Sequence, residues 1–356
     1  MNYIDSMLEA VGSTPLLKLN KIGRGLGANL FVKLEYLNPS GSYKDRMALA
    51  MVEAAERGDT WNGRKLSPAG TVCDSSAGNT APALSFVCAC KDIKAKIAVY
   101  RPMLRGDSAR LKIAGAFGSD VCESSLPEQY LSAEQAEAFK DENYDLTYIV
   151  AGKMHSSELE RNHDDVIWLD QIYNPYNYLG QKAIGNEIFD QLDGKIDAFG
   201  CSVGSGATLL GTCLAFREKG LTPEITYGVV PYGSEVYMQL DKDECNRNEF
   251  HRSDIMLRMA KAMGLEKWTT EKSIIDVMLE TGYPDLFFRI TTEEARAMAN
   301  RLCSEEGIYC GMSSGANVAV ACKIAKRLGQ EKNVVTVIVD RRDRYLGEYP
   351  NDVYIV

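Results

Sequence analysis

Short apolar segments alternate with longer amphipathic segments along almost the whole chain of 356 residues. The apolar segments are predicted strands, and they occupy residues 30–34, 70–73, 97–100, 196–200, 225–230 and 334–339. Helical patterns follow the first three strands, at 44–57, at about 80–90 and from about 107. A strand-then-helix alternation predicts an α/β fold with parallel sheets and helices on both faces. Ligands of such folds bind beyond the carboxyl ends of the strands.

The alternation is interrupted between about Asp120 and Asn177 by a polar stretch that we interpret as two acidic helical segments. A chain of this length can form two domains, each with its own hydrophobic core. We therefore expect a domain boundary, or a boundary with an insertion, in this stretch.

Composition excludes several classes of function. The net charge of −9 and the pI near 5.1 argue against binding to nucleic acid and to anionic membranes. The longest nearly uninterrupted apolar stretch, 81–90, is much shorter than the roughly 20 residues of a membrane span. The ten cysteines form no Cys-x-x-Cys pair and the three histidines lie far apart, so we expect no metal site. No export signal begins the sequence, and we predict a cytoplasmic protein.

Lys44 is the first candidate catalytic residue. A turn-forming Asn-Pro-Ser-Gly-Ser segment at 38–42 places it at the start of the predicted helix 44–57. The partial positive charge of a helix N-terminus disfavours an ammonium and lowers its pKa. A neutral amine is the form that reacts in Schiff-base chemistry. On spacing alone, an ordinary lysine in a first helical turn fits as well.

Three loops rich in small residues open predicted helices, at 75–80, 200–208 and 311–317. Backbone N–H groups at a helix N-terminus form anion sites. The loop 200–208 suits a single phosphate monoester, with Ser205 and Thr208 as added donors, because it matches neither the dinucleotide fingerprint nor a P-loop. A serine in the third loop could bind a pyridine nitrogen without favouring its protonation. Each loop alone could also be a capped helix start or a tight turn.

The lysine and the three loops, in this order, resemble the cysteine synthase/cystathionine β-synthase family of pyridoxal-phosphate enzymes, the fold-type II group. Further segments are similar to motifs of that family, and they lie at 11–16, 33–39, 45–46, 171–175 and 340–346. The resemblance implies two doubly wound parallel-sheet domains of the tryptophan synthase β-like architecture. The smaller would comprise residues 36–165 with 1–11, and the larger residues 12–35 with 166–356. It also implies a homodimer.

The resemblance implies a role for each motif residue. Lys44 would hold pyridoxal 5′-phosphate as a Schiff base and then act as the base on the substrate α-carbon. Asn79 would bind the phenolic oxygen of the cofactor, and Ser313 would face its pyridine nitrogen. The phosphate would be bound by Gly204, Ser205, Gly206, Ala207 and Thr208. The α-carboxylate of a small amino-acid substrate would be bound at Ser76, Ala77, Thr80 and Gln171.

Departures from the family pattern leave the substrate open. Ala77 replaces a serine, 103–107 and 252–265 are unfamiliar, and the closing motif carries Arg341 and Arg342 where Ser and Gly are expected. The leading hypothesis is cysteine synthase-like β-replacement, which joins an activated serine to sulfide. One alternative is a cysteine desulfhydrase that releases sulfide by β-elimination. Another uses O-phosphoserine and an amine, as a 2,3-diaminopropionate synthase does, and Arg101 and Arg105 motivate it. A non-catalytic protein with this fold is the last alternative.

Overall fold

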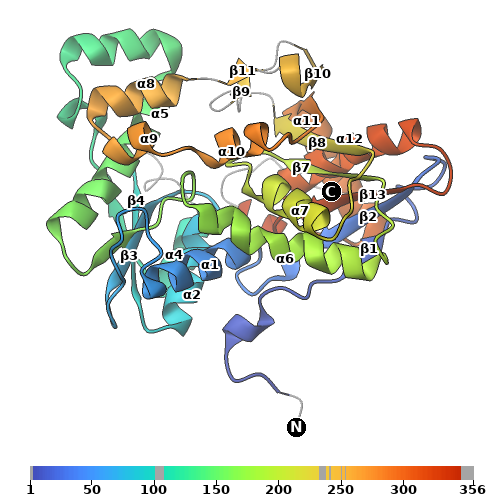
Figure 1. Ribbon diagram of the computed structural model, residues 1–356, viewed down its shortest axis with the longest axis horizontal. Coiled ribbons are helices and arrows are strands. Elements are labelled where there is room, and N and C mark those ends of the chain that lie inside the picture. Colours follow the sequence, from blue (N-terminus) through green and yellow to red (C-terminus); the bar gives the residue numbers. More distant parts are fainter. Residues whose placement is uncertain are drawn as a thin grey trace.

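The computed structural model describes residues 3–100, 108–231, 238–239, 242–249, 251–252 and 254–345. It contains two main sheets with helices packed on both faces of each (Figure 1). Arg101 and Arg105, together with Leu346 of the closing motif, lie outside the described residues. No helix in the described part of the chain is long and apolar enough to cross a membrane.

The larger sheet has seven strands in the order β1-β2-β13-β7-β8-β12-β10. The bounds are β1 Leu16–Lys18, β2 Asn29–Leu34, β13 Asn333–Ile338, β7 Ala198–Ser202, β8 Ile225–Pro231, β12 Leu286–Ile290 and β10 Glu244–Asn246. The five strands from β2 to β12 are parallel, whereas the edge strands β1 and β10 pair antiparallel. Strand β2, near the start of the chain, thus lies beside β13, near its end.

Helices cover both faces of the larger sheet, as the predicted α/β fold requires. One face carries α6 (Pro175–Gln191) and α7 (Ala207–Glu218), and the other carries α11 (Thr292–Glu306) and α12 (Met312–Arg327). Alternate residues of β13 enter opposite cores: Val335 packs with the α6 and α7 side chains, and Val334 with those of α11 and α12. The doubly wound arrangement is confirmed for this sheet.

The smaller sheet contains four parallel strands in the order β5-β4-β3-β6. Its bounds are β3 Thr71–Ser75, β4 Lys94–Val99, β5 Asp120–Glu123 and β6 Val166–Trp168. One face packs on α1 (Lys44–Arg57), α2 (Thr80–Cys90) and α4 (Ala109–Ala116). The other face packs on α5 (Ala133–Asn162), which is covered in turn by α8 (Ile255–Met263) and α9 (Glu266–Thr270). Part of the unfamiliar segment 252–265 therefore supports α5 with buried methionines.

The stretch 120–177 differs from the sequence prediction. It contains two strands of the smaller sheet, β5 and β6, and one helix of 30 residues, α5, instead of two helical segments. Strands of three and four residues are too short to show a period, which explains why they were not predicted. Strand β6 pairs with β3, so residues 166–168 belong to the smaller sheet, whereas the predicted boundary assigns them to the larger domain.

The remaining elements are short. Strands β9 (Met238–Gln239) and β11 (His251–Arg252) pair with each other, and α10 spans Ile274–Glu280. The 3₁₀ helices are η1 Met7–Ala10, η2 Glu35–Leu37, η3 Pro127–Gln129, η4 Arg247–Glu249 and η5 Arg342–Tyr345.

Candidate active site

Lys44 lies where the two sheets meet. Helix α1 begins at Lys44, as predicted, and packs on the smaller sheet. The residues before it are joined to the end of β13 in the larger sheet: the Tyr43 N–H donates to the Val339 carbonyl (3.0 Å), and Ser42 forms a bridge with Asp340. The lysine is therefore held at the carboxyl end of a central parallel strand, where ligands of such folds bind.

The surroundings of Lys44 favour its neutral form. Burial lowers the pKa of its ammonium from 10.5 to about 8, the negative charge of Asp74 opposes this shift, and the positive charge of Lys153 adds to it. Within the described part of the chain, the hydrogen bond of Nζ is to Gln171 Oε1 (3.4 Å), and the Tyr43 ring centroid lies 4.9 Å away. A substantial fraction of this amine is thus unprotonated near pH 8.

The predicted substrate-binding residues lie together next to Lys44. Gln171 follows β6, and its Oε1 also accepts a hydrogen bond from Thr80 Oγ1 (2.5 Å) at the start of α2. Ser76 and Ala77, in the loop before α2, line a cavity of about 210 Å³ together with Gln171. All four residues therefore border one region beside the Lys44 amine.

Asn79 is held by two residues of the closing motif. Its Nδ2 donates to Asp340 Oδ2 (2.6 Å), and its Oδ1 accepts from Arg344 Nη1 (2.5 Å). Burial raises the pKa of Asp340, although hydrogen bonds from Tyr345 and Asn79 oppose the shift. The second oxygen of Asp340 is buried without a hydrogen-bond partner among the described residues. Asp340 and Arg344 belong to the closing motif, and the sequence alone indicates no role for either residue.

The predicted phosphate loop is a tight turn between β7 and α7. Gly206 has φ of 83°, a left-handed conformation that favours glycine, and the helix begins at Ala207. A Cβ at Gly204 would meet no atom within 4 Å, so this side of the loop faces open space. Asn177, which sequence reasoning missed, donates to Ser205 Oγ (3.4 Å) and to the Gln171 carbonyl (2.6 Å). It therefore connects the loop with the Gln171 region.

The two serines at the start of α12 differ in their contacts. Ser314 is buried, and its hydroxyl accepts from the Val339 N–H (2.9 Å). Ser313 is partly exposed, and its hydroxyl has no partner within the described ranges. Asn317 fixes this helix start beside the end of β7, because its Oδ1 accepts from the Ser202 N–H (2.6 Å). Ser313 is thus the serine available to a ligand.

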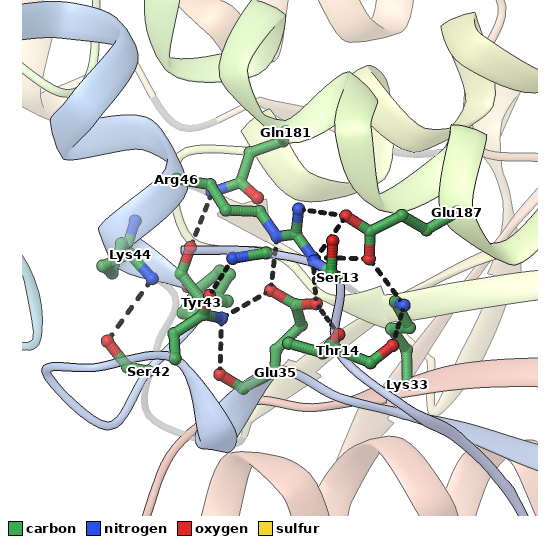
Figure 2. Close-up of polar contacts among 12 residues, drawn as sticks. Ser13, Thr14, Lys33, Glu35, Ser42, Tyr43, Lys44, Arg46, Gln181 and Glu187 are labelled. Carbon is green, nitrogen blue, oxygen red and sulfur yellow. Dashed lines mark hydrogen bonds and ion pairs between the residues drawn. The ribbon is translucent and has the colours of Figure 1, made fainter. Parts of the chain in front are cut away.

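A buried charge cluster lies on the other side of the start of α1 from Lys44 (Figure 2). Arg46 Nε donates to Glu35 Oε2 and its Nη1 to Glu187 Oε1, both at 2.7 Å. Glu187 also forms an ion pair with Lys33 at 2.7 Å. Burial alone would raise the pKa of Glu187, but Arg46 and Lys33 outweigh it and lower the pKa to about 2. This cluster ties the N-terminal segment and α6 to the helix that carries Lys44.

Comparisons with known proteins show the family and the fold of this chain. The family described as pyridoxal-phosphate dependent enzyme matches residues 7–340. A cysteine synthase of Staphylococcus aureus is 32% identical over 347 residues, which cover 97% of this chain and 96% of that protein. Cysteine synthase 1 of Emericella nidulans is 31% identical, with coverage of 96% and 84%. The structure of an O-acetylserine dependent cystathionine β-synthase from Helicobacter pylori superposes with a TM-score of 0.73 at 24% identity, and each chain is covered completely.

Proposed function

Because this chain belongs to the family of pyridoxal-phosphate dependent enzymes, we propose that it catalyses β-replacement on an activated serine, as cysteine synthases do. The donor is O-acetylserine, the nucleophile is sulfide and the product is cysteine. The observation that supports this proposal best is the Lys44 amine, whose pKa is lowered to about 8 beside Gln171 and Thr80. Full-length similarity to cysteine synthases adds a second, independent support.

The residues present fit the cofactor. The turn before α7 offers backbone N–H groups and open space at Gly204 for a phosphate. Ser313 offers a free hydroxyl for the pyridine nitrogen, and Asn79 offers an amide fixed in orientation by Asp340 and Arg344. Lys44 offers the amine that reacts with an aldehyde. The chemistry that pyridoxal phosphate supplies when bound is electron withdrawal from the α-carbon of the amino acid.

The side chains perform the remaining steps. Gln171 and Thr80 orient the α-carboxylate of the donor, so that its α-hydrogen faces Lys44. The neutral amine removes this proton. Acetate then leaves from Cβ with the electron pair of the C–O bond, the sulfur of the nucleophile forms the new bond to Cβ, and Lys44 returns the proton to Cα. The net products are cysteine and acetate.

The donor is identified by mixing the purified holoenzyme with O-acetylserine, O-phosphoserine or cysteine and recording the visible spectrum. We expect a rapid spectral change with O-acetylserine that added sulfide reverses as cysteine forms. Sulfide release from cysteine without any added nucleophile, together with no response to O-acetylserine, would replace this proposal with the desulfhydrase. A response to O-phosphoserine alone would favour the phosphorylated donor, whose motivating residues Arg101 and Arg105 lie outside the described residues.

The assembly and location of the protein are also proposals. We propose a homodimer, on the basis of the family resemblance, and a location in the cytoplasm, on the basis of the ten free cysteines. Size-exclusion chromatography with light scattering tests the first, and a monomer at micromolar concentration would contradict it.

A further inference from the structure

A second cavity lies at the edge of the smaller sheet, apart from the candidate active site. Its volume is about 360 Å³, and small-molecule sites usually have roughly 300–1,000 Å³. It is bordered by residues 59–61 after α1, by residues 173–176 after β6, and by α9 with Glu271 directly after it. The lining that the structure describes includes no residue predicted to bind the cofactor or the substrate. A ligand in this cavity would therefore leave the reaction centre open.

Aromatic rings form much of the wall of this cavity. Four aromatic residues border it, namely Trp61, Trp168, Tyr173 and Tyr176. The indole N–H of Trp61 donates to Glu160 Oε2 (3.1 Å), and the Tyr173 ring stacks on Trp268 with the centroids 5.0 Å apart. These contacts hold the rings in place. A fixed aromatic wall favours a ligand with its own aromatic ring, because paired rings attract each other beyond the effect of the buried area.

Lys267 brings a buried ammonium to the cavity. Its side chain is 2% exposed, and Nζ lies 4.7 Å from the centroid of the Trp168 ring and 3.8 Å from the Asp170 carboxylate. A separation of 3.8 Å is too long for a hydrogen bond, and no other acceptor for this ammonium lies in the part of the chain that the structure describes. Burial lowers the pKa of Lys267 more than Asp170 and Glu160 raise it. An anionic group in the cavity would supply the missing acceptor.

Glu271 places a negative charge near this ammonium. It follows Lys267 by four residues and its N–H donates to the Lys267 carbonyl (3.0 Å), so the two side chains start one helical turn apart on one face. Glu271 is exposed and forms no ion pair within the described ranges, whereas Asp59, the other acidic residue of the lining, is paired with Arg57 (2.9 Å). A buried cation and an exposed anion at this spacing match the carboxylate and the ammonium of a free α-amino acid.

Helix α9 also holds the turn that directs Gln171 toward Lys44. Asp170 has φ of 48°, a left-handed conformation that is uncommon for residues other than glycine. Its Oδ2 accepts from Trp268 Nε1 (2.7 Å), and Lys267 adds the ion pair. Gln171 comes next and accepts from the Lys44 amine, whereas residues 173–176 border the cavity. A ligand that contacts Lys267 and the 173–176 segment therefore restrains the chain on both sides of Gln171.

We propose that this cavity is an effector site for an α-amino acid with an aromatic side chain. Lys267 binds its carboxylate, Glu271 binds its ammonium, and the aromatic wall binds its ring. Binding restrains the segment around Gln171 and thereby raises the affinity of the active site for its amino-acid substrate. The binding site does not depend on the proposed β-replacement, and only its effect on the substrate does.

The three tryptophans of the chain report on this cavity, because Trp61 and Trp168 line it and Trp268 stacks on Tyr173. L-phenylalanine is titrated into the holoenzyme while tryptophan fluorescence reports on the cavity and cofactor absorbance on the active site. We expect a saturable change in fluorescence at concentrations that leave the absorbance unchanged. 3-Phenylpropionate lacks the ammonium and should bind a few-fold more weakly, whereas L-alanine lacks the ring and should not change the fluorescence. No fluorescence change with millimolar L-phenylalanine would overturn the proposal.

Two variants test the two charges separately. Lys267→Gln should weaken the binding of both L-phenylalanine and 3-phenylpropionate by about tenfold to a hundredfold, the value of one charge-assisted hydrogen bond. Because loss of a buried cation can also disturb the fold, the exposed Glu271 provides an independent test. Glu271→Gln should weaken L-phenylalanine by about twofold to fivefold, the value of an exposed ion pair, and leave 3-phenylpropionate unchanged.

Glu266 offers a matched control, because it is an exposed acidic residue of α9 that does not line the cavity. Glu266→Gln should leave the binding of both ligands unchanged. The same loss in this control, or an equal effect of Glu271→Gln on the two ligands, would overturn the assignment of Glu271 to the ammonium.

The effect on the active site is measured with L-alanine, which has no leaving group and so binds there at equilibrium. Its affinity, followed by cofactor absorbance, should rise about fivefold or more with saturating L-phenylalanine, and L-alanine should tighten L-phenylalanine by the same factor. Binding of L-phenylalanine without this reciprocal change would overturn the effector role. If O-acetylserine is not turned over but the fluorescence titrations behave as expected, the proposed reaction fails and the amino-acid site stands. If β-replacement proceeds but the fluorescence does not respond, the amino-acid site fails alone.

Discussion

Lys44 and Arg46 are two cations in the first turn of α1 that the protein treats in opposite ways. Arg46 donates to both Glu35 and Glu187, and these carboxylates raise its pKa although burial alone would lower it. Lys44 has one long hydrogen bond, to Gln171, among the described residues, and burial lowers its pKa to about 8. Side chains two positions apart on an α-helix point about 200° away from each other. One helical turn can therefore hold a reactive amine on one side and a paired charge on the other. Full pairing gives a fixed charge, and the lack of a paired anion gives a reactive amine.

The largest expected effect comes from removing the amine. Lys44→Met should lower turnover by at least about a thousandfold, because the variant loses both the Schiff-base partner and the base. Borohydride reduction of the wild type should attach the cofactor to the peptide that contains Lys44. Attachment to a different lysine would contradict the contrast between Lys44 and Arg46, because Lys44 would then be an ordinary buried cation.

Removing Arg46 should affect folding more than removing Lys44. Arg46→Met leaves Glu35 and Glu187 without their main partner, and breaking a buried ion pair in this way costs about 3–5 kcal/mol. We expect a loss of this size in the free energy of unfolding, measured in urea on the apoenzyme. Lys44→Met is the matched control, and its stability should remain near that of the wild type. Equal losses in both variants would contradict the division of roles.

The pKa of Lys44 predicts how cofactor uptake depends on pH. Schiff-base formation needs the neutral amine, and a lowered pKa means that this form predominates above about pH 8. The rate of cofactor uptake by the apoenzyme should rise about tenfold per pH unit below pH 8 and then level off. A stopped-flow absorbance measurement checks this. An uptake rate that keeps rising up to pH 10 would mean that Lys44 has the pKa of an ordinary lysine. Asp74→Asn should shift the midpoint of this pH profile to lower pH, because the negative charge of Asp74 raises the pKa of Lys44.

The smallest expected effect concerns Ala77, on the Lys44 side of the molecule. Ala77→Ser would add one neutral hydrogen bond to a substrate carboxylate, which is worth about 0.5–1.5 kcal/mol, or a few-fold to about tenfold in affinity. Binding of O-acetylserine and cysteine, followed by cofactor absorbance, should tighten or stay unchanged. Clear weakening would mean that the added hydroxyl clashes with the substrate in the cavity that Ala77 lines.

The sequence predicted the helices whose apolar periodicity and preceding turn residues lie within one short segment. The predicted helices 44–57 and 80–90 coincide with α1 and α2, because their apolar periodicity is clear and a turn precedes each. Strands β5 and β6 escaped prediction because three or four residues form a strand only through their neighbours in the sheet.

The same distinction applies to the candidate site. Lys44, Thr80 and Gln171 belong to recognisable motifs, and the structure brings them together. Asn177 and Lys153 carry no motif, and their importance depends on which elements pack beside them. Lys153 meets Asp74 only because α5 packs across β3, and no pattern along the chain specifies that contact.

The pairing of β2 with β13 has a consequence for folding during synthesis on the ribosome. Asn29 lies opposite Asn333 in the register of the sheet, so β2 leaves the exit tunnel some three hundred residues before its partner. The smaller sheet, complete at Trp168, can close while synthesis continues. Ribosome-bound chains that stop before residue 333 should therefore be cut by protease within 16–34 but resist cleavage within the strands of the smaller sheet, at 71–75, 94–99, 120–123 and 166–168. Until β13 has been synthesised, the edge of β2 that pairs with it is unpaired and able to associate with other chains.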